Sequence, residues 1–334
     1  MKKRIVFVER QKFGAVSIER VFAQVARTLP SDLFDIEFQN LTYGHGLFAI
    51  LKALFFFRPR PADIYHVTGD VHHITLRLPR KKTVLTIHDL GFLRLNKGIR
   101  RFILKLLFLD LPVRAAGYIT AISHATRDEI ISYFPAAESK IRVIDNPLFD
   151  GFSAEPEKSF DTECPTILQI GTTENKNLPT LIEAITGLNC KLRIVGPLNN
   201  KIRHKLKTSG INFESVASVD DHEIVEEYRR ADIVSFCSTY EGFGLPIIEA
   251  QAMRKPVVTS DLPPMNDVAG AGAALADPHD SERMQQAFLG VINDPDYRKR
   301  LIENGTENIR RFDPEVIADQ YQQVYLEVIK ANLK

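Results

Sequence analysis

The sequence predicts an α/β fold of two doubly wound domains, each built on a mostly parallel β-sheet. Short runs of β-branched and apolar residues alternate with amphipathic stretches, which is typical of βαβ units. A chain of 334 residues also exceeds the usual length of one domain. We expect strands at 5–8, 63–67, 83–87, 118–121 and 142–144, then at 166–170, 192–195, 233–236, 256–258 and 273–275.

Helix ends and a linker complete this outline. Asp220 and Glu223 have the spacing of a capping box, and Ser123 is a suitable N-cap. The composition turns polar between Asn146 and Pro165, which indicates a linker. We therefore expect one domain over 1–150, a second over 151–312 and a closing segment over 313–334. That segment is predicted to be an amphipathic helix from four apolar residues at helical spacing: Ile317, Tyr321, Val324 and Val328.

Composition excludes several classes of protein. The net charge is +1, from 43 basic and 42 acidic residues, which argues against a nucleic-acid-binding protein. No signal peptide opens the chain, and the longest apolar stretch, 47–57, is interrupted by Lys52. It is also shorter than the roughly 18–20 residues of a membrane span. We expect a cytoplasmic protein.

The most informative segment follows the predicted strand 233–236. Two glycines allow a tight turn there, and Pro246 suits the first turn of a helix. A strand, a glycine-rich turn and an exposed helix N-terminus together form an anion site. The amides expected to face a phosphate or a sugar belong to Gly242, Phe243, Gly244 and Leu245.

Glu241 and Glu249 flank this turn. A carboxylate can accept hydrogen bonds from two hydroxyls at once, so both acids suit the diols of a ribose or a hexose. An acidic pair at this spacing is often structural. Its position in a strand–turn–helix frame favours the functional interpretation.

The sequence here resembles family 4 of the retaining glycosyltransferases. Glu241 and Glu249 match the E-x7-E motif of that group. Four further segments match the family in order along most of the chain: 86–90 with His88, 119–128 with Ser123, 171–177 with Lys176, and 256–263 followed by 274–278. The spacing alone is moderately specific, whereas the ordered set is highly specific.

The resemblance implies a GT-B fold, in which two Rossmann-like domains face each other across a cleft and the last helix packs back on the first domain. The second domain would bind a nucleotide-diphosphate-sugar donor, and the first would bind a saccharide or lipid-linked saccharide acceptor. The implied reaction is a metal-independent retaining transfer in surface polysaccharide, lipopolysaccharide or glycolipid assembly. No cofactor is expected.

The resemblance also assigns roles to residues. Lys176 would neutralise the diphosphate, Glu241 would contact the transferred sugar and Glu249 would bind the ribose. His88 would lie near the reacting centre, so His88, Lys176 and Glu241 form the expected catalytic set. Donor-phosphate loops are expected at Gly14, Gly171, Thr172 and Thr173.

Physical chemistry supports the assignment of Lys176. Transfer develops negative charge on the departing diphosphate, and without a metal a protein cation and helix-end amides must stabilise it. Lys176 follows the strand 166–170, and Asn177 can cap a helix over 178–185. Many relatives carry an arginine before this lysine, where this chain has Thr172 and Thr173. The hydroxyls of these threonines could donate to phosphate but carry no charge. Lys201 or Arg203 could supply the missing positive charge, although we favour solvated surface positions for these two residues.

Other histidines and motifs carry weaker signals. His88 also has a structural alternative, a hydrogen-bonded histidine beside a capping Asp89. No carboxylate or cysteine pattern turns His66, His72 and His73 into a metal site, so a substrate-facing loop is favoured. The glycine fingerprint of dinucleotide-binding enzymes is absent.

Two stretches, 47–60 and 100–109, combine apolar and basic residues. They could place the protein at the inner face of a membrane as a peripheral contact. The favoured alternative is that their apolar residues pack on the first sheet while the basic ones are solvated.

Two other functions fit the same architecture. A nucleotide-sugar epimerase would convert a donor without an acceptor. A catalytically silent nucleotide-sugar-binding regulator would bind a donor without turnover.

Overall fold

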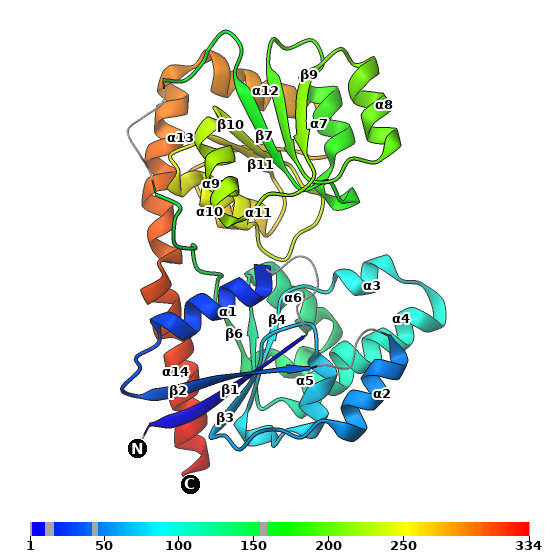
Figure 1. Cartoon of the computed structure of the whole chain (residues 1–334), viewed down its shortest axis with the longest axis vertical. Helices are drawn as coiled ribbons and strands as arrows, with labels where there is room; N and C mark the ends of the chain where they lie inside the picture. Colours follow the sequence, from blue (N-terminus) through cyan, green and yellow to red (C-terminus); the bar gives the residue numbers. More distant parts are fainter. Residues whose placement is uncertain (1, 11–16, 42–45, 154–158, 334) are drawn as a thin grey trace. The chain divides into compact units, whose positions relative to one another are not determined.

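The computed structural model describes residues 2–10, 17–41, 46–153 and 159–333. The chain forms two compact units, one of Met1–Pro147 with Asp313–Lys334 and one of Leu148–Phe312. Each unit has one six-stranded sheet with parallel pairing throughout, flanked by helices (Figure 1). The predicted α/β fold with two Rossmann-like domains is therefore confirmed.

The sheet of the first unit has the order β2-β1-β3-β4-β5-β6. Its central strands β3 and β4 are buried throughout because both faces of a parallel sheet are covered. All five residues of β4 are buried, for example. The strands are β1 (Lys3–Arg10), β2 (Phe34–Leu41), β3 (Ile64–Val67), β4 (Thr83–Ile87), β5 (Tyr118–Ala121) and β6 (Ile141–Val143).

The helices of the first unit connect successive strands of its sheet. Ser123 accepts a hydrogen bond from the amide of Thr126, as its predicted capping role requires. The α-helices are α1 (Ser17–Thr28), α2 (Leu47–Phe56), α3 (Gly91–Leu95), α4 (Gly98–Lys105), α5 (Leu111–Ala115), α6 (His124–Tyr133) and α14 (Pro314–Asn332). Shorter helical segments are η1 (His72–Arg77), η2 (Arg80–Lys82), η3 (Leu106–Asp110) and η4 (Pro135–Lys140).

The last helix, α14, packs on the first unit, as expected. Its predicted apolar positions are buried, and it contacts α1 and β3. A polar link fixes it to the sheet, because Nδ1 of His66 lies 2.7 Å from the hydroxyl of Tyr325. The other ring nitrogen of His66 lies 2.7 Å from the hydroxyl of Thr86 on β4.

The sheet of the second unit has the order β12-β11-β10-β7-β8-β9. Its strands are β7 (Thr166–Ile170), β8 (Lys191–Val195), β9 (Asn212–Val216), β10 (Ile233–Phe236), β11 (Val257–Ser260) and β12 (Ala274–Ala276). The sequence did not predict β2 or β9. Both are edge strands, and their polar residues are partly exposed, so neither shows an apolar run.

Of the helix caps predicted in the second unit, one is confirmed and one is wrong. Asp220 and Glu223 form the expected capping box at α9. Asn177 precedes the helix predicted at 178–185, but its side chain does not cap that helix. The elements are η5 (Glu174–Lys176), α7 (Leu178–Ile185), α8 (Asn200–Thr208), α9 (Asp221–Arg230), α10 (Leu245–Ala252), α11 (Met265–Ala269), α12 (Ser281–Asn293), α13 (Pro295–Asn308) and η6 (Ile309–Phe312).

The two apolar and basic stretches of the first unit are not fully buried. The favoured expectation of packing on the sheet is wrong for Phe48, Phe55, Ile99 and Phe102, which are 80%, 69%, 74% and 61% exposed. The helix α2 buries Ala53, whereas α4 has no fully buried residue and the buried position of that stretch is Leu109 of η3. Among the described residues, no helix is long and apolar enough to cross a membrane.

Candidate functional site

Two loops meet at the carboxyl edge of the second sheet. β7 and β10 are parallel neighbours, so the segments that follow them lie at the same edge. The first segment runs from Gly171 to Asn177, and the second runs from Cys237 to Gly244. Ligands of open α/β sheets bind at this edge.

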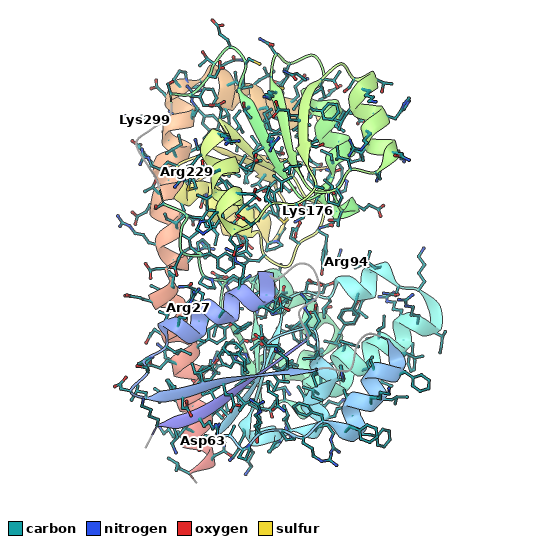
Figure 2. All side chains as sticks on the ribbon, in the orientation of Figure 1. Arg27, Asp63, Arg94, Lys176, Arg229 and Lys299 are labelled. Carbon is teal, nitrogen blue, oxygen red and sulfur yellow. The ribbon has the colours of Figure 1, made fainter. Side chains whose placement is uncertain are left out.

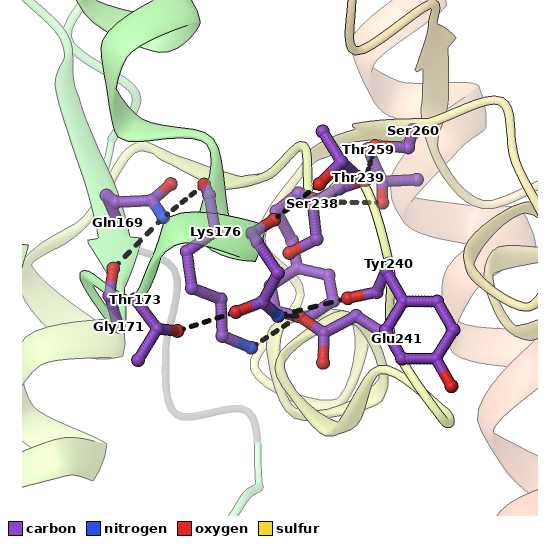
Figure 3. A network of polar contacts seen from close by, with 12 residues as sticks. Gln169, Gly171, Thr173, Lys176, Ser238, Thr239, Tyr240, Glu241, Thr259 and Ser260 are labelled. Atoms are coloured by element: carbon purple, nitrogen blue, oxygen red, sulfur yellow. Dashed lines mark hydrogen bonds and ion pairs between the residues drawn. The ribbon is translucent and has the colours of Figure 1, made fainter. Parts of the chain in front are cut away.

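Lys176 and Glu241 form the centre of this site. The ammonium of Lys176 lies 2.6 Å from Oε1 of Glu241 (Figure 3). It also lies 4.6 Å from the centre of the Phe236 ring, within range of a cation–π interaction. Both charged side chains are partly buried, at 19% and 16% exposed, so solvent screens the pair less than it would screen a surface pair.

Asn175 connects the two loops. Its side-chain amide donates to the carbonyl of Tyr240 and to Oε1 of Glu241, each at 3.0 Å. Its backbone carbonyl accepts from the amide of Thr239 at 2.8 Å. Thr173 in turn donates to Oδ1 of Asn175 at 2.7 Å. Glu241 therefore receives two donors from one loop, which fixes its carboxylate.

Glycine is required at position 171. The backbone there has a φ of +84°, which side chains with a Cβ rarely adopt. A Cβ would also approach Cε of Lys176 to 3.0 Å and Cγ to 3.1 Å. The stem of Lys176 consequently lies against the bare backbone of Gly171, and this close approach sets the direction of the ammonium.

The turn before α10 leads into the N-terminus of that helix. Gly244 occupies the N-cap position with a φ of +132°, and Pro246 lies in the first turn. The first amides of a helix have no acceptor within that helix, and they favour an anion. The ring of Phe243 is 3% exposed and packs edge-on against Phe312. Its side chain anchors the turn.

Glu249 lies inside α10 and is held by a tyrosine. The hydroxyl of Tyr228 on α9 donates to Oε2 of Glu249 at 2.6 Å. Tyr228 is fully buried, and burial, with Glu249 as a second cause, raises its pKa well above 10. The phenol therefore remains a donor throughout the physiological pH range. Sequence reasoning missed Tyr228 because no local pattern links α9 to α10.

Thr172 and Thr173 already use their hydroxyl hydrogens within the protein. Thr172 donates to the carbonyl of Pro197 at 2.7 Å, and Thr173 donates to Asn175. Thr172 also fills the space that a Cβ at Gly196 would need. Lys201 and Arg203 are exposed on α8, as the solvated interpretation expects.

Asn177 ties the site to a third strand. With a φ of +56°, its side-chain amide donates to the carbonyls of Cys237 and Pro278, at 3.2 and 2.6 Å. The side chain thus bridges loops after β7, β10 and β12. This bridging explains why it does not cap α7.

In the first unit, His88 follows β4 and is 5% exposed. Its Nε2 lies 2.7 Å from the carbonyl of Thr68, which can only accept, so Nε2 carries a hydrogen. Asp89 accepts from the amide of Gly91 at 2.7 Å, although the N-cap residue of α3 is Leu90. A neutral imidazole that carries its hydrogen on Nε2 can accept a hydrogen bond at Nδ1. Gly14, the other predicted loop residue of this unit, lies outside the described residues.

His66, His72 and His73 of this unit are buried. His66 lies within β3, not after it, which corrects the expectation of a substrate-facing loop. Burial, with His88 as a second cause, lowers its pKa to about 3. Nδ1 of His72 donates to the carbonyl of Phe108 at 2.6 Å, and burial lowers the pKa of His73 to about 4. No group of three or more metal-ligating side chains occurs in the described part of the chain.

Comparisons with known families agree with the geometry. The family described as Glycosyl transferases group 1 matches residues 153–308, and Glycosyltransferase Family 4 matches residues 20–148. The two matches together span most of both units. The chain belongs to the family 4, group 1 glycosyltransferases of GT-B type, and it is a glycosyltransferase.

Its relatives are distant. The O-antigen chain mannosyltransferase B of Escherichia coli is 27% identical over 290 residues, which cover 78% of this chain and 74% of the relative. The phosphatidyl-myo-inositol mannosyltransferase of Mycolicibacterium smegmatis is 27% identical over 203 residues, covering 57% of this chain but only 50% of the relative. Among solved structures, Anabaena HepE in complex with UDP matches with a TM-score of 0.76 at 18% identity, covering 98% of this chain and 100% of that protein. At 18% identity, this similarity shows that the two proteins share a fold.

Proposed function

We propose that this enzyme transfers a sugar from a nucleotide-diphosphate-sugar donor to a hydroxyl of a saccharide or lipid-linked saccharide, with retention of anomeric configuration and without a metal. The names of its relatives support polysaccharide or glycolipid assembly, since one makes O-antigen chains and another mannosylates a phosphatidylinositol. A nucleotide diphosphate donor is supported by the UDP complex of the similarly folded Anabaena protein.

The paired Lys176 and Glu241 carry this proposal. When the bond between the anomeric carbon and the diphosphate oxygen breaks, the electron pair stays on the diphosphate. The ammonium of Lys176, held at the turn that precedes α10, can stabilise that charge together with the amides of the turn. With donor bound, Lys176 exchanges part of its contact with Glu241 for the phosphate, and Glu241 accepts hydroxyls of the transferred sugar.

The acceptor hydroxyl attacks the anomeric carbon on the face that the diphosphate leaves. A new oxygen–carbon bond forms as the old one breaks, and the leaving diphosphate oxygen takes the proton of the acceptor. This front-face route needs no enzymatic nucleophile. Glu249, oriented by Tyr228, binds the ribose hydroxyls of the donor, and His88 contacts a hydroxyl at the reacting centre.

The test uses the purified chain, a chelator, UDP-, GDP-, ADP- and dTDP-sugars, and mixed oligosaccharide and glycolipid acceptors. We expect one donor to be consumed only with an acceptor, and we expect nuclear magnetic resonance of the product to show the anomeric configuration of that donor. An inverted product, or loss of transfer on chelation, would reject the proposed mechanism. Donor conversion without an acceptor would favour an epimerase, and donor binding without turnover would favour a regulator.

We also propose that the first unit contacts a membrane surface. The exposed aromatic surface consists of Phe48, Leu51, Phe55 and Phe56 of α2 with Leu95, Ile99 and Phe102 around α4. The two groups of exposed side chains lie on elements that pack against the same segment. Helix α2 contacts η1, and so does η3, which directly follows α4. Exposed cations, among them Lys52 and Arg100, accompany the apolar side chains. Large exposed aromatics with basic neighbours suit an anionic lipid surface, where a lipid-linked acceptor would reside.

A further inference from the structure

A cavity of about 800 Å³ opens in the second unit at the edge of the sheet opposite the donor loops. Its lining includes Asp232, which directly precedes β10, and Pro256, which directly precedes β11. Since the donor loops follow the carboxyl ends of β7 and β10, the length of β10 separates the two places. Four strand residues span about 13 Å. A volume of about 300–1,000 Å³ is usual for small-ligand sites.

The lining of this cavity is strongly basic. Among the described residues that line it, the carboxylates are those of Asp232 and Glu303. Asp232 accepts from the amide of Thr166 at 2.9 Å, and Glu303 lies 3.9 Å from the ammonium of Lys299. Arg229 pairs with Glu226 outside the lining, and the ammonium of Lys255 donates to the carbonyl of Arg229 at 3.0 Å. The cationic residues of the lining are Arg229, Arg254, Lys255, Arg298 and Lys299. Such an excess of cations favours an anionic ligand.

One wall of the cavity is flat and apolar. The guanidinium of Arg298 lies 3.9 Å from the centre of the Phe160 ring, so the two planar groups are in contact. Donation from Arg298 to the carbonyls of Val291 and Ile292, at 2.7 and 3.1 Å, fixes its position. Met253 and Ile302 extend this wall. A planar ring or the face of a sugar could pack here.

Arg254 occupies a backbone conformation that suits glycine. Its φ is +55°, and Asn177 of the donor site is the only other non-glycine residue with positive φ in the described part of the chain. Asparagine tolerates this region, whereas arginine is disfavoured in it. Arg254 directly follows Met253, the C-cap residue of α10, a place where helices usually use glycine. The planar guanidinium fork that Arg254 brings to the cavity matches a phosphate.

We propose that this cavity is a second ligand site, separate from the donor site, for a phosphorylated small molecule of nucleotide size. The phosphate lies toward Arg254 and Lys255, and the ring or sugar lies against Phe160. Figure 2 shows Arg229 and Lys299 toward the α13 side of the unit, apart from Lys176. The proposal does not depend on the identity of the sugar donor.

Isothermal titration of the full chain with AMP, UMP and ribose 5-phosphate, in phosphate-free buffer, tests the proposal. We expect at least one probe to bind, and we expect Arg254→Gly and Lys255→Ala each to weaken its Kd about tenfold or more. Two controls should stay within about twofold of the parent: Lys176→Ala in the donor site, and Lys207→Ala on the exposed surface of α8.

Arg254→Gly also separates binding from folding. Glycine relieves the backbone strain at this position, so the melting temperature of the variant should equal or exceed that of the parent. Loss of binding in a protein of undiminished stability supports the site. The proposal is overturned if no probe binds, if binding survives Arg254→Gly, or if Lys176→Ala alone removes it.

Discussion

The ammonium of Lys176 lies 2.6 Å from Oε1 of Glu241, although the two residues are 65 positions apart in the chain. Each comes from a loop at the carboxyl end of a strand, and β7 and β10 are direct neighbours in the sheet. The pairing therefore follows from sheet order. It holds the cation at the turn that precedes α10 before any donor binds.

Replacing this cation should impair the chemical step. Lys176→Ala removes the group that stabilises the leaving diphosphate, and loss of one such donor costs about 10²–10³ in kcat. Steady-state kinetics with the donor identified by screening would measure it. Lys207→Ala, a loss of charge on the exposed surface of α8, serves as the control. A kcat for Lys176→Ala close to that of the parent would contradict the role assigned to the lysine.

Gly171 should be required for placing that lysine. Gly171→Ala forces a side chain into a backbone with φ of +84° and pushes on the stem of Lys176. The backbone penalty should be about 1–2 kcal/mol in the free energy of unfolding. We also expect kcat to fall about tenfold or more, because a small displacement of a catalytic group is costly.

Gly187→Ala is a matched control for that experiment. Gly187 has the same φ of +84°, but a Cβ there would meet nothing within 4 Å. The control should lose a similar amount of stability in urea titrations followed by circular dichroism while keeping its kcat. Equal loss of kcat in both variants would mean that Gly171 acts through stability alone.

The sequence predicted the centre of the fold better than its edges. Strands such as β4 and β10 are buried along their whole length, so their apolar runs are visible in the sequence. β2 and β9 lie at sheet edges, where half-exposed polar residues hide the strand pattern.

Some residues of the candidate site could be named from the sequence, whereas others could not. Local motifs indicated Lys176, Glu241 and Glu249, because glycine turns and helix starts are encoded within a few residues. Contacts between distant segments carry no local signal. Asn175 and Tyr228, which hold the two acids, therefore emerge only from the packed structure.

Tyr228 should control donor affinity more than turnover. Tyr228→Phe removes the hydrogen bond to Oε2 of Glu249 and leaves a buried carboxylate oxygen without that donor. We expect a loss of about 1–3 kcal/mol in the free energy of unfolding. The KM for the donor should rise several-fold while kcat changes less, since the ribose is remote from the bond that breaks. Tyr297→Phe, on α13, is the control, and a pure kcat effect would refute the assignment.

The buried His66 should make stability depend on pH. Burial lowers its pKa from 6.5 to about 3, so between these values the unfolded chain binds a proton that the folded chain does not. The resulting stability is fully present above pH 6.5 and is lost as the pH falls toward 3. The slope from one such histidine reaches about 1.4 kcal/mol per pH unit. Urea titrations from pH 7 to 5 should show a shallower slope for His66→Gln, whereas exposed His204→Gln should leave it unchanged.

The exposed aromatic surface should bind anionic lipid. Phe48 and Phe55 are 80% and 69% exposed, and burying one such side chain contributes about 1.5–3 kcal/mol. The double variant Phe48→Ser/Phe55→Ser should therefore lose about tenfold or more of its affinity for phosphatidylglycerol vesicles in sedimentation assays. Leu333→Ser, which removes a 77% exposed apolar side chain beyond α14, should bind as the parent does. Because the exposed aromatic surface contains none of the residues assigned to the chemistry, transfer to a soluble acceptor should survive in the double variant. If the parent does not sediment with the vesicles, or if both variants lose binding equally, the aromatic surface is not a membrane contact.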